Sequence, residues 1–89
     1  MRLKVLLPDH PEYRKAIIHT LEKGGTFLFV FTTLANSPCE KDYWFMERDD
    51  ALEWADETLG VHPDQWTELP EPLPGQAAHL EYDEHGALL

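Results

Sequence analysis

Cysteine is nearly absent from the 89-residue sequence, and a long apolar segment is missing. Cys39 has no second cysteine to pair with, which excludes an internal disulfide and is typical of a reducing compartment. The apolar run at the start of the chain is interrupted by Pro8 and Asp9, well short of the ~20 residues that a membrane-spanning helix needs. We therefore expect a soluble cytoplasmic protein with no signal peptide and no membrane contact.

Lysine and arginine are absent from the second half of the chain. All seven Lys and Arg residues lie within residues 1–48, together with six acids, for a net charge of +1. Residues 49–89 contain the other eleven acids and have a net charge of −11, so the whole chain has a net charge of −10. This charge argues against a nucleic-acid partner, because phosphate contacts require clustered Lys and Arg. It favours a basic protein partner instead.

Strong catalytic and cofactor motifs are also missing, so we expect no cofactor and no enzyme. Gly24 and Gly25 precede a strand pattern rather than a helix, which excludes a phosphate-binding loop. Cys39 has acidic neighbours and no visible base, which disfavours a reactive thiolate. One alternation would place four possible metal ligands on a single strand face: His79, Glu81, Asp83 and His85. A solvated strand face explains this pattern better, so a small metal-dependent enzyme is the remotest alternative.

The first part of the sequence predicts a strand followed by a helix. Leu and Val alternate with Arg and Lys at the start of the chain, which indicates a strand that ends at Pro8. Asp9 and Glu12 have the spacing of a capping box, with apolar residues recurring on one helical face after them. Gly24 and Gly25 are then expected to end this first helix.

The next part predicts a hairpin and a second helix. Residues 26–34 are apolar on both faces and indicate a central strand, and residues 41–48 follow after a short loop as its antiparallel partner. Asp49 or Asp50 is expected to cap a helix that ends at Gly60. A short extended piece is expected around residues 66–69.

This order of elements predicts an α+β fold with the ferredoxin-like βαββαβ plan, an antiparallel sheet with two helices packed on one face. Residues 1–69 would form this core. Residues 70–89 would add a Pro-rich spacer and a C-terminal strand that packs on the same single domain. One core is expected to bury six residues together: Ile17, Leu21, Phe29, Phe45, Leu52 and Leu59.

The candidate partner-binding residues lie around the second predicted helix. Glu53, Asp56 and Glu57 form like-charge pairs, and the last two also oppose the helix dipole, so stability alone does not account for them. Trp44, Met46 and Trp54 are expected to be exposed beside this acidic rim as apolar anchors. The full candidate set is Trp44, Met46, Glu53, Trp54, Asp56, Glu57 and Asp64.

These patterns predict a non-enzymatic protein-binding module of the inhibitor, immunity-protein or nucleic-acid-mimic type, with a basic partner. The alternative is a structural homodimer that self-associates through the sheet face or the C-terminal strand. Solubility by itself is a third explanation of the acidic surface.

Overall fold

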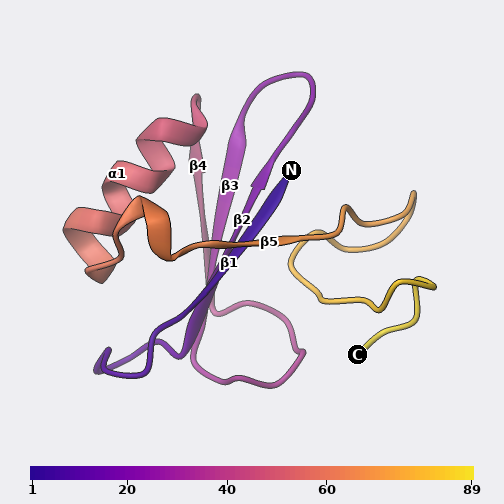
Figure 1. The fold of residues 1–89 in the computed structure, drawn as a ribbon, viewed down its shortest axis with the longest axis horizontal. Coiled ribbons are helices and arrows are strands. Elements are labelled where there is room, and N and C mark those ends of the chain that lie inside the picture. The colour runs from indigo at the N-terminus through magenta and orange to yellow at the C-terminus, as the bar shows by residue number, and fades with distance from the viewer.

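A five-stranded antiparallel sheet forms the centre of the computed structural model, which describes residues 1–89 (Figure 1). The strands are β1 (Arg2–Leu6), β2 (Lys15–Thr20), β3 (Thr26–Phe31), β4 (Lys41–Phe45) and β5 (Thr67–Leu69). Their order across the sheet is β4-β3-β2-β1-β5, so the chain runs from β1 to β4 as a meander and then crosses back to add β5 beside β1. The crossover contains the single α-helix, α1 (Arg48–Leu59), and a 3₁₀ turn, η1 (Pro63–Gln65). No helix has the length and apolar character needed to cross a membrane.

The predicted ferredoxin-like fold with two helices is wrong, because the segment expected as the first helix contains β2. This strand is rich in β-branched residues, Ile17, Ile18 and Thr20, which favour an extended backbone. It pairs with β1 on one side and β3 on the other, and its first four residues are buried. Gly24 and Gly25 turn the β2–β3 hairpin, with φ angles of 97° and 93°, instead of ending a helix.

The elements predicted after β2 are confirmed as far as β5. β3 and β4 form the expected antiparallel hairpin, and α1 ends at Gly60, which has a φ of 72°. The predicted caps Asp49 and Asp50 are wrong, because α1 begins at Arg48 and its N-cap residue Glu47 makes no side-chain hydrogen bond. The two aspartates instead lie in the first turn, where their charge favours the helix through its dipole.

α1 covers one face of the sheet and closes the main core (Figure 1). Ala51 and Ala55 are fully buried, so their small side chains let the helix approach β3 and β4 closely. Leu59 and Val61 extend this contact past the end of the helix. The buried residues of the main core are Val5, Leu7, Tyr13, Ala16, Ile18, Leu28, Val30, Ala51, Ala55, Leu59 and Val61.

Residues 70–89 pack on the opposite face of the sheet as an irregular segment (Figure 1). Beneath them lies a second, smaller cluster of Ile17, Phe29 and Phe31. The predicted single core is therefore wrong, because side chains alternate between the two faces of each strand and divide the apolar residues. Leu21, which was expected in that core, is 37% exposed beyond the end of β2.

The predicted C-terminal strand is also wrong. Residues 79–89 contain only an isolated bridge between Tyr82 and Leu88. A tight turn joins the two sides of this bridge, and the Oδ1 atom of Asp83 accepts hydrogen bonds from the backbone N–H groups of His85 and Ala87. The segment is thus held on the sheet by side chains rather than by strand pairing.

Arg2 is the main anchor of this segment, although its side chain comes from the opposite end of the chain. Its Nε and Nη2 donate to the carbonyl of Pro70 at 2.9 and 2.7 Å. Its Nη1 donates to the carbonyls of Ala78 and Leu80 at 3.0 and 2.5 Å. Arg2 is only 1% exposed, so these bonds replace the water that a guanidinium loses on burial.

Glu81 supplies the ionic part of the attachment. Its two carboxylate oxygens accept from Lys4 Nζ at 2.7 Å and from Lys15 Nζ at 3.0 Å, and Lys15 is fully buried over the ring of Phe31. Glu71 similarly pairs with the N-terminal amine. Part of the charge asymmetry between the two halves of the chain is therefore internal, because these acids of the second half neutralise positive groups of the first.

Candidate partner-binding surface

The four predicted acids of the crossover, Glu53, Asp56, Glu57 and Asp64, have no Lys or Arg partner. We call these residues the acidic helix surface. Lys4 and Lys15 pair only with Glu81, and Asp56 has a single contact, with His62 Nδ1 at 3.5 Å. The last turn of α1 contains no basic residue. This surface therefore presents uncompensated negative charge to solvent, in contrast to Glu81 on the other side of the sheet.

Trp54 lies on α1, and its side chain packs against the sheet instead of being fully exposed to solvent. Its ring lies 4.6 Å from that of Tyr43 and 6.0 Å from that of Phe45, measured between centroids. Both aromatic partners come from β4 and pack against the main core. Trp54 thus fixes the helix on the sheet, and only the outer part of its half-buried ring borders the acidic helix surface.

Trp44 lies on the other side of the sheet from the acidic helix surface, and Met46 lies just beyond the end of β4. Trp44 pairs in register with Phe27, whose side chain packs on the second cluster, away from α1. Trp44 is 56% exposed and Met46 is 71% exposed, at the edge of the sheet that β4 forms. The structure therefore separates Trp44 from the acidic helix surface, while Met46 lies between β4 and the start of α1.

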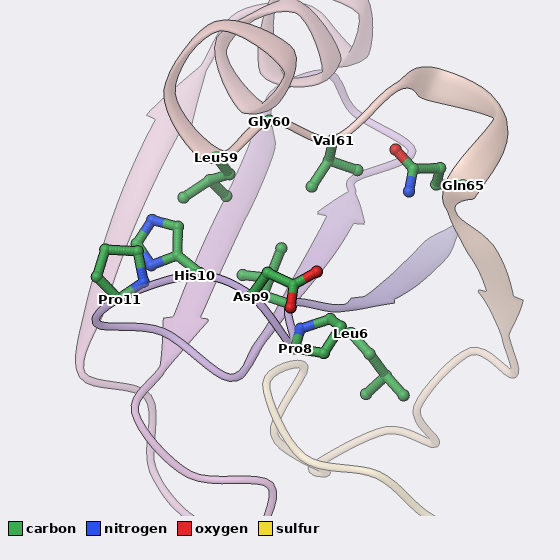
Figure 2. A pocket seen from close by; sticks show the side chains of 10 residues that line it. Leu6, Pro8, Asp9, His10, Pro11, Leu59, Gly60, Val61 and Gln65 are labelled. Carbon is green, nitrogen blue, oxygen red and sulfur yellow. The ribbon is translucent and has the colours of Figure 1, made fainter.

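A pocket of about 300 Å³ opens at the C-terminal end of α1 (Figure 2). Its walls are the end of β1 with the β1–β2 connection, residues 6–11, the helix end, residues 59–61, and Gln65 of η1. The Asp9 side chain lies on the pocket wall formed by this connection, and no Lys or Arg lines the cavity. Sequence reasoning missed this site because it interpreted Asp9 as the cap of a helix that does not form.

His10 fixes the shape of the connection that lines the pocket. Its Nδ1 accepts hydrogen bonds from the backbone N–H groups of Glu12 at 3.1 Å and Tyr13 at 2.9 Å, and its ring stacks on Tyr13. Arg14 donates to the His10 carbonyl at 2.7 Å.

The residues considered for metal binding or nucleophilic chemistry do not assemble into a site. No three His, Cys, Asp or Glu residues come together in a geometry that would hold a metal ion. His79 packs on Phe29, Glu81 binds two lysines and His85 is exposed. Burial raises the pKa of Cys39, and Asp42 raises it further, which keeps the thiol protonated.

Comparisons with protein-family models, with curated protein sequences and with solved structures gave no match. The arrangement of charge, exposure and cavities in this chain is therefore the basis for assigning it a function. The acidic helix surface and the pocket at the end of α1 are adjacent, because Asp56 and Glu57 precede Gly60 by about one helical turn.

Proposed function

We propose that this protein is a non-enzymatic binding domain that uses the acidic helix surface to engage a basic protein. The observation that carries the proposal is the concentration of unpaired acids on α1 and the η1 turn that follows it. Glu81 is paired with buried or half-buried lysines, whereas Glu53, Asp56, Glu57 and Asp64 have no Lys or Arg partner. Unpaired acids on one side of a domain attract a basic partner and accelerate association.

The position of these acids has a cost in stability, which supports a role outside folding. Asp56 and Glu57 are near the C-terminal end of α1, where the helix dipole disfavours negative charge, and Glu53 repels both. Each effect costs a few tenths of a kcal/mol, roughly 0.2–0.5. The helix beneath them is fixed by buried Ala51 and Ala55, so the surface is presented in a preorganised arrangement.

Self-association is the second candidate, now through a different surface from the one predicted. Residues 70–89 pack on part of the sheet face within the same chain, which leaves the edge of β4 as the surface that this candidate would use. The outer edge of β4 has no neighbouring strand and carries exposed Trp44 and Met46. These are the features of a β-strand that pairs with a second chain.

A retention experiment tests the main proposal. The immobilised chain is exposed to an extract of its source cells at low ionic strength and eluted with a salt step, and the affinity of each eluted protein is measured after purification. We expect the Asp56→Lys/Glu57→Lys variant to lose a basic partner chiefly through slower association. The control Glu22→Lys/Glu84→Lys makes the same change in net charge at exposed sites away from α1.

Two results would contradict the proposal. Equal loss of affinity in the helix variant and in the control would mean that net charge alone attracts the partner. Failure of any basic protein to bind, together with a dimer that strengthens on a sizing column as salt rises, would favour self-association, because salt screens the repulsion between two acidic copies.

A further inference from the structure

We propose that the pocket at the C-terminal end of α1 receives an arginine side chain of the basic partner, an inference that rests on the proposed function. The pocket adjoins the acidic helix surface, and its volume of about 300 Å³ is at the lower limit of ordinary ligand sites. A cavity of this size suits one long side chain better than a whole cofactor. Its lining supplies the three features that an arginine requires.

The first feature is negative charge without a competing base. Asp9 takes part in no ion pair within the chain, and it lies at the pocket (Figure 2). The last carbonyls of α1 point out of the helix end beside Gly60 and carry the negative pole of the helix dipole. No Lys or Arg lines the cavity, and the nearby Arg14 guanidinium donates to the carbonyls of His10 and Tyr13.

The second feature is an apolar wall for the methylene stem. Leu59 and Val61 line the pocket and are themselves anchored in the main core, which keeps the wall rigid. Leu6, at the end of β1, lines the opposite part of the pocket wall and is more than half exposed. Long basic side chains bury their stems on such surfaces while the charged head reaches a polar group.

The third feature is a set of hydrogen-bonding groups on the lining of the pocket. Asp9 would offer two carboxylate oxygens to a planar guanidinium, and the free carbonyls at the end of α1 would accept its remaining N–H groups. Gln65 uses its Oε1 to accept the His62 backbone N–H at 2.7 Å, which leaves the amide nitrogen free to donate to a main-chain carbonyl of the partner. A lysine ammonium would leave more of these acceptors unsatisfied because it has only three donors.

The test uses small probes and the full chain, so the partner need not be identified first. Amide chemical shifts are followed by NMR at low ionic strength while n-butylguanidinium chloride, n-butylammonium chloride or neutral N-butylurea is added. We expect saturable shifts at residues 9–10 and 59–65 with butylguanidinium, and weaker binding with the other two probes. Asp9→Asn should weaken butylguanidinium binding about tenfold, whereas Glu12→Gln, an exposed change on the same connection outside the pocket, should not.

Each alternative result overturns the inference in a recognisable way. Equal binding of butylurea would identify a merely apolar pocket, and equal binding of butylammonium would remove the preference for arginine. Unchanged binding in Asp9→Asn would place the probe elsewhere. A basic partner whose affinity depends on Asp56 and Glu57 but is unaffected by Asp9→Asn would contradict the arginine pocket and leave the proposed function intact. A pocket that binds the probe in a protein with no basic partner would contradict the proposed function and leave the pocket intact.

Discussion

Glu81→Gln is the most informative single change in this chain, because it removes one charge from a network whose members are unequally buried. Lys15 is fully buried, Lys4 is partly exposed, and both use Glu81 as their only acidic partner. The glutamine keeps the shape and an acceptor oxygen but leaves the Lys15 ammonium without a counter-charge. Breaking a buried pair from one side costs about 3–5 kcal/mol, and the retained hydrogen bond places the expected loss near ~3 kcal/mol.

The loss is measured by urea unfolding at pH 7, with Glu84→Gln as the matched control. Glu84 is 86% exposed and pairs only with the neighbouring His85, so its neutralisation should change the free energy of unfolding by less than about 0.5 kcal/mol. A chain of this length has a total stability of roughly 4–13 kcal/mol, so a loss of ~3 kcal/mol is readily detected. A value for Glu81→Gln no larger than that of the control would refute the reasoning.

We also expect Glu81→Gln to change how the free energy of unfolding depends on pH. Burial by itself raises the pKa of Glu81, but the hydrogen bonds and charges of Lys4 and Lys15 outweigh it, and the net pKa lies below its ordinary value of 4.5. The contribution of Glu81 is therefore fully present above the unfolded-state pKa and is lost as pH falls through the folded-state pKa. The difference in stability between wild type and Glu81→Gln should shrink below pH 4.5. A difference that is constant from neutral to acidic pH would assign the effect to packing.

Three further changes test other parts of the structure. Phe29→Ala should lower the free energy of unfolding by about 3 kcal/mol, measured by urea denaturation; a loss below about 1 kcal/mol would mean that the second cluster contributes little. Gly25→Ala should destabilise by more than about 1 kcal/mol, because φ is 93° and the added Cβ would lie 2.9 Å from Trp44 Nε1; combining it with Trp44→Ala should recover part of the loss, and no recovery would show that the backbone alone is responsible. Asp56→Lys/Glu57→Lys should raise the free energy of unfolding by roughly 0.3–1 kcal/mol, because it restores complementarity with the helix dipole, and thermal unfolding would show this as a slightly higher midpoint.

Local sequence predicted the elements whose signals agreed with their surroundings. α1 has a buried stripe and ends at a glycine, and β3 is apolar on both faces, so each was identifiable on its own. β2 was not identified, because Asp9 and Glu12 have the spacing of a capping box by coincidence. In the structure, the backbone N–H groups of Glu12 and Tyr13 donate to His10 Nδ1 instead. The β-branched content of β2 was the signal that would have identified it.

The candidate site was predicted only as far as charge alone allows. The exposed acids of α1 were identifiable because they have no adjacent base. The pocket was not predicted, because it brings residues 6–11 next to residues 59–65, and the predicted topology did not place these two segments together. Glu81 was interpreted as a solvated strand residue because its partner Lys15 is 66 positions away in the chain.

The contacts of Arg2 join residues that are synthesised far apart in time. Its acceptors Pro70, Ala78 and Leu80 follow it by 68 to 78 positions, so the guanidinium has no partner while the β1–β4 meander is emerging from the ribosome. Until residue 81 is available, the face that carries Lys15 and Phe29 is uncovered. Contacts this distant in sequence slow the final step, because the loop must close before any bond forms. A chain that lacks residues 70–89 would leave this apolar face of the sheet exposed, and exposed apolar surface favours aggregation or chaperone binding.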